Sequence, residues 1–274
     1  MPNTQMAGED LELLARELQE DLEARSERQV FAGSRGPANV AEAYQLQRAL
    51  RAFRESRGET VVGFKIGYTS PTVRRNSQKF MGLNESVHGY LWDTEAHASG
   101  ATVDHRRLGI EGELAVTLLS VNGDDPAGWD VAYSPIVELH MMGMDGPPAD
   151  NQGRRGLELI GTNCIHAGVV HCADAQRCLL GEIPVDTPMT VTIGGKHIES
   201  VTLSELQVDG VYGPVGTVGW LQRTLRSEGH GDDALLVAGA VLICSTPGGL
   251  YPVDPGGEVR VEFEGLVTTC IADT

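Results

Sequence analysis

The amino-acid sequence predicts an α+β protein, in which a helical N-terminal segment is followed by a mainly β body. Near the N-terminus, leucines recur at the three- and four-residue spacing of a helix with one buried stripe: Leu11, Leu14, Leu18 and Leu22. After about residue 60, short apolar runs alternate with turn residues instead. We therefore expect a helical cap over residues 1–60 and a β body over residues 61–274.

A second helix is expected within the cap. Asn39 is a favourable N-cap residue, and Glu42 follows it three positions later, as in a capping box. The buried side of this helix would be formed by Tyr44, Leu46, Leu50 and Phe53. The helix should end near Gly58, since glycine commonly follows the last helical turn.

The body should consist of short strands and one further helix. We expect strands over 61–66, 111–119, 135–142, 189–193, 197–201, 241–245, 258–263 and 267–271. Gly194 and Gly195 separate two of these runs and predict a hairpin. The late helix covers 215–225 and ends in basic residues and Gly229. The polar segment 144–156 predicts a loop.

Composition limits the possible partners. The chain carries 21 Lys and Arg against 38 Asp and Glu, a net charge of −17, which opposes binding to nucleic acid or an anionic membrane. No apolar run reaches the roughly 18 residues of a membrane span, and the N-terminus has no signal-peptide order. The five cysteines form no CxxC pair, so we expect reduced thiols and a cytoplasmic protein.

Two glutamates begin the strand EGELAVTLL. Side chains alternate along a strand, so Glu111 and Glu113 should lie on one face, while Gly112 faces the other way. Glu138 stands inside a second apolar run, PIVELHMM. Buried carboxylates need a counter-charge, and three carboxylates with no cysteine or histidine at ligand spacing favour Mg²⁺ or Mn²⁺. The pattern alone also fits a strand whose carboxylates face solvent, with Glu138 paired to an arginine.

A lysine in an apolar strand is a second candidate. Lys65 lies within VVGFKIG and is followed by Thr69 and Ser70. Because lysine is rarely buried without a partner, its ammonium could bind or protonate an acidic substrate. A half-exposed lysine at a sheet edge is the alternative. Further along, the turn STPGG, with Thr246 and Gly249, could hold an anion on its backbone N–H groups.

The histidines carry less information. Glu85 precedes His88 by three residues and could form an acid–base pair with it in a helix or loop. His140 would share the face of Glu138 on a strand, and His166 lies in an apolar segment. For each of these histidines, a structural role is favoured over a ligand or base. The sequence contains no GxSxG, P-loop, GxGxxG or HExxH motif.

Four segments, taken in order, resemble one family: VVGFKIGYTS, GIEGELAVTLL, PIVELHMMGM and VLICSTPGGLYPVDPGGEVRVEFEGL. The chain is similar over about residues 10–271 to the fumarylacetoacetate hydrolase superfamily. Within it, the similarity is to the branch of 2-keto-4-pentenoate hydratases and 2-oxo-3-hexenedioate (4-oxalocrotonate) decarboxylases, enzymes of aromatic-compound catabolism. This resemblance implies a mixed β-roll as the catalytic domain, with the helical cap packed on it.

The resemblance also implies the chemistry. Glu111, Glu113 and Glu138 match the family's ligands for Mg²⁺ or Mn²⁺, and Lys65 matches its active-site lysine. The metal would chelate a small anionic 2-oxo or 2-hydroxydienoic acid and stabilise the enolate formed during the reaction. We therefore expect a metal-dependent, hydratase-like lyase. A homo-oligomer is expected from the family, with pairing to a related subunit as a variant.

Two departures leave alternatives open. Where hydratases carry an acidic residue before a pocket glycine, this chain has Val87 and His88, and an asparagine–leucine motif is replaced by residues 213–216. The alternatives are a decarboxylase of an unsaturated 2-oxo diacid, an acylpyruvate C–C hydrolase and a non-catalytic assembly subunit. The segment STPGGLYPV is similar to the hydrolase side of the superfamily, and the hydrolase would use Glu85 and His88 to activate water.

Overall fold

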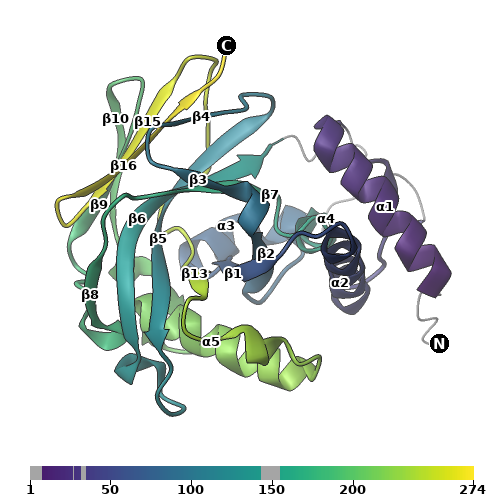
Figure 1. Cartoon of the computed structure of the whole chain (residues 1–274), viewed down its shortest axis with the longest axis horizontal. Helices are drawn as coiled ribbons and strands as arrows, with labels where there is room; N and C mark the ends of the chain where they lie inside the picture. The colour runs from purple at the N-terminus through teal and green to yellow at the C-terminus, as the bar shows by residue number, and fades with distance from the viewer. Residues whose placement is uncertain (1–7, 27, 32–34, 143–154) are drawn as a thin grey trace.

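The computed structural model describes residues 8–26, 28–31, 35–142 and 155–274 (Figure 1). The α-helices of this part are α1 (Gly8–Ala24), α2 (Val40–Ser56), α3 (Pro71–Met81), α4 (Arg155–Gly161) and α5 (Gly213–Glu228). Its short 3-10 helices are η1 (Gln29–Phe31), η2 (Asp93–Glu95), η3 (Pro126–Gly128), η5 (Leu180–Glu182), η6 (Leu203–Glu205) and η7 (Asp232–Leu235). Of the loop expected over 144–156, residues 144–154 lie outside the described residues.

The strands follow the order of the chain. They are β1 (Val61–Gly67), β2 (Val87–Trp92), β3 (Ala96–Ala98), β4 (Ala101–Val103), β5 (Leu108–Ser120), β6 (Asp130–Met141), β7 (His166–His171), β8 (Gln176–Leu179), β9 (Pro188–Ile193), β10 (Lys196–Thr202), β11 (Gln207–Val208), β12 (Val211–Tyr212), β13 (Val241–Ile243), β14 (Tyr251–Pro252), β15 (Glu258–Phe263) and β16 (Leu266–Ala272). All the expected strands are present, and the expected hairpin is formed by β9 and β10.

The two N-terminal helices pack on each other. The leucine stripe of α1 meets the apolar side of α2 in a shared core that includes Leu14, Leu18, Leu46 and Leu50. The α2 N-cap forms as expected, with Asn39 accepting a hydrogen bond of 3.0 Å from the backbone N–H of Glu42. The division into a cap over 1–60 and a body over 61–274 remains a prediction.

Two sheets form the body. The larger has the order β2-β1-β13-β5-β6-β7-β3, with β14 also pairing with β5 and β8 with β6. It is mixed, because β1 and β13, and also β3 and β7, run parallel while its other pairs are antiparallel. The second sheet has the order β10-β9-β15-β16-β4. Figure 1 shows the long strands β5 and β6 curling through the molecule, so the expected mixed α+β roll is confirmed.

The packing of the two sheets decides which way the β5 side chains point. A Cβ atom built on Gly112 would lie 2.5 Å from Cγ2 of Val191 in the second sheet. Only glycine permits this approach, so position 112 faces the core between the sheets. Glu111 and Glu113 therefore face away from the second sheet, as the alternation predicts.

Several elements were not expected from the sequence, among them α3, α4 and β2. The α3 segment PTVRRNSQKFM is mostly polar, although Ser70 caps it and Pro71 occupies its first turn. The α4 segment has only seven residues. The β2 segment VHGYLW is buried throughout, so it has no polar–apolar alternation to mark it as a strand.

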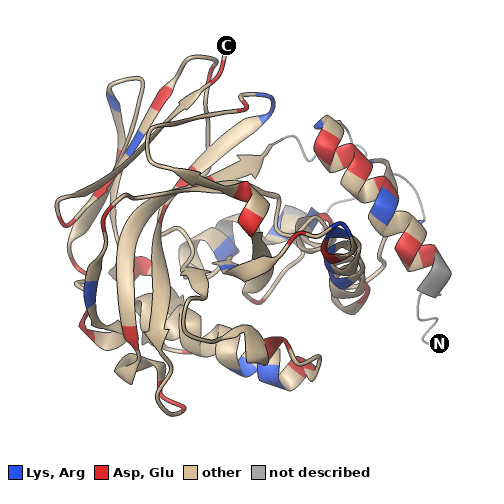
Figure 2. Cartoon of the chain, viewed as in Figure 1, with Lys and Arg blue, Asp and Glu red and all other residues tan. Residues whose placement is uncertain are grey.

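The surface is acidic, as the composition requires. Figure 2 shows several acidic residues along α1, whereas most of the ribbon of the two sheets carries no charged residue. None of the helices in the described part of the chain is long and apolar enough to cross a membrane.

Candidate functional site

The pairing of β5 with β6 brings the acidic residues together. Glu111 lies directly opposite Glu138, and Gly109 lies opposite His140. Opposite residues share a face, and so do residues two apart on one strand. Glu111, Glu113, Glu138 and His140 therefore project from the same face of the large sheet. Glu138 is fully buried, and Glu113 is 2% exposed.

One subset of this cluster has the spacing of a metal site. Candidate ligand atoms of Glu111, Glu138 and His140 all lie within 4.8 Å of one another. The Nε2 atom of His140 is 3.1 Å from Oε2 of Glu111 and 3.6 Å from Oε2 of Glu138. The sequence placed His140 on this face but favoured a structural role for it. Glu113, which the sequence proposed as the third ligand, is outside this subset, and its role as a ligand remains a prediction.

Lys65 reaches the same cluster from β1, which is separated from β5 by β13. Its Nζ lies 2.7 Å from Oε1 of Glu138 and donates a hydrogen bond of 3.2 Å to the carbonyl of Cys164. Burial alone would lower the pKa of Lys65, but the surrounding carboxylates, Glu138 above all, raise it above its ordinary value. The alternative of a half-exposed edge lysine is therefore wrong, because this side chain is buried and positively charged.

The carboxylates differ in their surroundings. Burial would raise the pKa of Glu138, but Lys65 and then His140 hold it well below its usual range. By contrast, burial and the charges of Glu138 and Glu111 raise the pKa of Glu113 well above its usual range. The Oε2 atoms of Glu113 and Glu138 have no hydrogen-bond partner among the described residues.

Glu111, Glu113 and His140 of this cluster, together with Lys65, line a cavity of about 400 Å³, and we call this part of the lining its floor. Polar lining residues include Lys65, Thr69, Ser70, Glu111, Glu113, His140 and Thr246. Apolar lining residues include Val73, Met81, Val87, Leu159, Ile165 and Leu250. Among the described lining residues, Lys65 is the one cationic side chain apart from the histidine. The volume suits a small organic acid whose reacting end meets the polar floor.

The residues expected to bind substrate all line this cavity. Ser70 caps α3 by accepting from the N–H of Val73, and Thr69 Oγ1 is buried without a hydrogen-bond partner in the described structure. Thr246 donates a hydrogen bond of 3.2 Å to the carbonyl of Gly112. The N–H of Gly249 is already used, since it donates to Oε2 of Glu199 at 3.2 Å.

Two lining residues have backbone angles that L-residues rarely adopt. Tyr68, with φ of 63°, directly follows β1, and Ser245, with φ of 76°, follows β13. Such conformations cost of order 1–3 kcal/mol and are concentrated at functional sites. Because β1 and β13 are neighbours, the two strained turns lie at the same end of the sheet, around the cavity.

The expected pair of Glu85 and His88 is not brought together. Glu85 is exposed, whereas His88 is buried in β2 rather than in a helix or loop. His88 lies opposite Ile66, while Lys65 lies opposite Gly89, so His88 points to the other side of the sheet from Lys65. Its Nε2 atom is 3.2 Å from Oε1 of Glu228 on α5.

Several neighbours of the site were not assigned to it from the sequence. Glu199 arrives from β10 of the second sheet and accepts a hydrogen bond of 2.7 Å from the hydroxyl of Tyr251. Glu199 and Tyr251 stand in segments whose sequence does not predict burial, so only the contact between the two sheets could identify them. His166 is the other such neighbour, with Nδ1 2.7 Å from Oε1 of Glu138. Its place in an apolar strand was the only available signal.

A divalent cation fits these residues. Three carboxylates face one ammonium, so two negative charges remain without a counter-charge in the cluster. The free oxygens of Glu113 and Glu138 and the ring nitrogens of His140 offer hard or borderline donors, which suit Mg²⁺ or Mn²⁺. No cysteine is among the three residues with ligand spacing.

Comparison with known proteins gives both sequence and structural matches. The chain is 33% identical to a 2-hydroxyhexa-2,4-dienoate hydratase of Comamonas testosteroni over 84 residues, which are 29% of this chain and only 30% of the hydratase. It is 25% identical over 236 residues to a 4-oxalocrotonate decarboxylase of Pseudomonas sp. strain CF600, covering 82% of each protein. No family model matches the chain.

A solved structure shows the same fold. The 4-oxalocrotonate decarboxylase of Pseudomonas putida G7, complexed with magnesium and adipate, superimposes with a TM-score of 0.76 over 98% of this chain and 100% of that one, at 20% identity. The fold and the carboxylate-lined cavity thus define an α+β protein of the fumarylacetoacetate hydrolase type. In sequence and in fold, the chain is similar to hydratases and 4-oxalocrotonate decarboxylases, the branch that its sequence motifs resemble.

Proposed function

We propose that this protein is a metal-dependent lyase that acts, like a hydratase, on a small 2-oxo or 2-hydroxydienoic acid. The observation that carries the proposal is the juxtaposition of Lys65 with the carboxylate cluster on the floor of the cavity. The matched hydratase and decarboxylases, one of them complexed with magnesium, support it. Glu111, Glu138 and His140 would hold Mg²⁺ or Mn²⁺, with Glu113 as a further ligand.

The bound ion would supply Lewis-acid stabilisation of the negative charge that develops on the 2-oxo oxygen. The chain's own groups would do the remaining work. The ammonium of Lys65 would balance the substrate's charge and donate a hydrogen bond to it, because it is buried, charged and close to the floor. The free hydroxyl of Thr69 would donate a hydrogen bond to a substrate oxygen.

The walls of the cavity favour hydration over decarboxylation of a diacid. Val73, Met81, Val87, Leu159 and Leu250 give the cavity an extensive apolar lining. The described cavity lining has no arginine, and Lys65 is held at the floor by Glu138. A second carboxylate at the far end of the substrate would therefore be desolvated without an ion-pair partner, which is unfavourable.

The decarboxylase remains the second candidate. It is favoured by the longer sequence match, 82% of each protein, and by the fold of the adipate-bound decarboxylase. The hydrolase alternative is less favoured, because it keeps the STPGG segment but loses its second support, since Glu85 is exposed while His88 is buried and points toward α5. A non-catalytic subunit would have no need for a buried ammonium beside a carboxylate cluster at the floor of a cavity.

The test is a panel assay on the purified protein in EDTA and with Mg²⁺ or Mn²⁺. The panel contains 2-hydroxydienoates, unsaturated 2-oxo diacids and acylpyruvates, and mass spectrometry separates hydration, loss of CO₂ and C–C cleavage. We expect hydration of a 2-hydroxydienoate that stops in EDTA. Glu111→Gln should abolish it, while Glu262→Gln, in an exposed pair with Arg260, should not. Metal-independent turnover, or none at all, would contradict the proposal.

A further inference from the structure

The two oxygens of Glu138 have different surroundings. Oε1 lies 2.7 Å from Nζ of Lys65 and also 2.7 Å from Nδ1 of His166. Oε2 has no hydrogen-bond partner among the described residues and lies 3.6 Å from Nε2 of His140. Two strong contacts thus occupy one oxygen and turn the other toward the cluster. A carboxylate held in this way presents a single oxygen to a cation.

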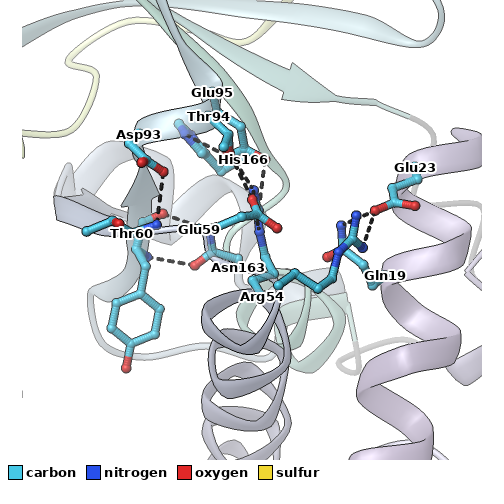
Figure 3. Close-up of polar contacts among 12 residues, drawn as sticks. Gln19, Glu23, Arg54, Glu59, Thr60, Asp93, Thr94, Glu95, Asn163 and His166 are labelled. Carbon is cyan, nitrogen blue, oxygen red and sulfur yellow. Dashed lines mark hydrogen bonds and ion pairs between the residues drawn. The ribbon is translucent and has the colours of Figure 1, made fainter.

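His166 is itself held from behind (Figure 3). Its ring is fully buried, and its Nε2 atom faces Oε2 of Glu95 at 3.7 Å. The other oxygen of Glu95 lies 2.8 Å from Nη1 of Arg54, which belongs to α2. Arg54 also pairs with Glu59 at 2.5 Å and stacks over the ring of Trp92. Neither Nε2 of His166 nor Oε2 of Glu95 has a hydrogen-bond partner among the described residues, so the link between these two residues is a charge contact rather than a hydrogen bond. Through it, Arg54 of the second helix is connected to His166 and so to Glu138.

The backbone before His166 is also fixed. Asn163, Cys164 and Ile165 have φ of 57°, 56° and 52°, a left-handed conformation that is costly for residues other than glycine. The side chain of Asn163 accepts from the N–H of Tyr90 at 2.7 Å and donates to its carbonyl at 2.8 Å. This bidentate contact ties the strained turn to β2, and the carbonyl of Cys164 meets Lys65. The strained turn thus brings His166 close to the carbonyl of Cys164, which accepts a hydrogen bond from Lys65.

We propose that His166 is a positioning residue for Glu138, which it holds as a single-oxygen metal ligand, and that Glu95 and Arg54 hold His166 in turn. The inference rests on the proposed metal site and adds to it the residues that orient one ligand. Hydrogen bonds to metal-binding carboxylates fix their orientation, and losing them commonly costs about 10–100-fold in metal affinity. Without His166, the Glu138 carboxylate would keep Lys65 alone and could rotate about its last side-chain bond.

The experiment measures Mn²⁺ binding by electron paramagnetic resonance and calorimetry on the full chain. In His166→Phe the ring is kept and both nitrogens are lost, so Mn²⁺ should bind about 10–100-fold more weakly. In His166→Asn the amide N–H stands close to the position of Nδ1, so affinity should return to within a few-fold of the unsubstituted protein. Glu95→Gln should weaken binding less than His166→Phe does. His171→Phe, on the same strand but outside these contacts, is the matched control.

A purely structural role for His166 would lower thermal stability without this pattern of loss and rescue. If His166→Phe does not fold, His166→Gln replaces it, because its amide reaches the position of Nε2 and not that of Nδ1. Equal Mn²⁺ affinity in the Asn variant and in the Phe or Gln variant would overturn the inference. If the unsubstituted protein binds no Mn²⁺, the proposed metal site fails instead, so the two failures are distinguishable.

Discussion

Replacing Glu113 should raise the free energy of unfolding without metal and reduce the stabilisation that metal provides. Its carboxylate is 2% exposed, one oxygen has no partner in the described structure, and Glu111 and Glu138 are nearby. Without metal, the charge is therefore unfavourable. With metal, the same carboxylate would be a ligand. Glu113→Gln keeps the size of the side chain and removes the charge, so it separates these two contributions.

The magnitudes follow from general values. A buried group without a partner costs about 1–3 kcal/mol and more when it is charged, so removing the charge in Glu113→Gln should gain about 1–3 kcal/mol in EDTA. Metal at 100 times its Kd stabilises a protein by about 2.7 kcal/mol, but a variant that binds 100-fold more weakly gains only about 0.4 kcal/mol. The variant should therefore be more stable without metal, and metal should add about 2.3 kcal/mol less stability to it than to the unsubstituted protein. In a chain of this size, each kcal/mol is about 2–4 °C in Tm.

The assay is calorimetry of both proteins in EDTA and across a Mn²⁺ series, repeated at several pH values. Burial and the neighbouring carboxylates raise the folded-state pKa of Glu113, so its destabilising effect is absent below the unfolded pKa of about 4.3 and grows as pH rises. In EDTA, the difference in stability between Glu113→Gln and the unsubstituted protein should therefore grow as pH rises. A variant that is less stable than the unsubstituted protein in EDTA at pH 7 would refute the reasoning. An unchanged Mn²⁺ shift would show that Glu113 is not a ligand.

Three further outcomes are expected. Lys65→Met should lower kcat about 10²–10⁴-fold in the panel assay, while Mn²⁺ binding, measured by paramagnetic resonance, persists. Gly112→Val should destabilise the fold by about 1–3 kcal/mol in urea unfolding, because its side chain would meet Val191. The Arg106 hydrogen bond lowers the pKa of Asp104 to about 2. Asp104→Asn should therefore lower the free energy of unfolding by under ~1 kcal/mol at pH 7, and this difference should shrink to nothing as pH falls from about 4 to 2.

The parts of the site that the sequence could predict depend on local periodicity. Glu111 and Glu113 share a face because strand side chains alternate, and no knowledge of the sheet is needed to see it. Lys65 stands out because a lysine is rare in an apolar strand. The α2 N-cap at Asn39 is likewise a local hydrogen bond. Glu138 stands out in a similar way, as a lone carboxylate in an apolar run, and the resemblance to a known family connected it to the other two carboxylates.

What the sequence could not predict depends on register and on contacts between distant elements. Glu138 stands opposite Glu111 only in one register of β5 and β6, and a slip of one residue would move it to the other face. The same register decides that His140 joins the cluster. Glu85 and His88 fit an acid–base pair by spacing, but β2 turns His88 toward α5. Glu199 enters from another sheet altogether.

The contacts of Glu111 and Glu138 also explain how the sheet can hold the carboxylate cluster without a bound ion. Lys65 and His166 occupy one oxygen of Glu138, and His140 faces Glu111 at 3.1 Å. These two carboxylates are therefore oriented by contacts that do not need the metal, so binding an ion would not have to fix their rotamers. Glu113 lacks such a contact in the described structure. It follows that substitutions of Glu113 should act mainly on the net charge of the cluster, whereas substitutions of His166 should act mainly on the orientation of the Glu138 carboxylate.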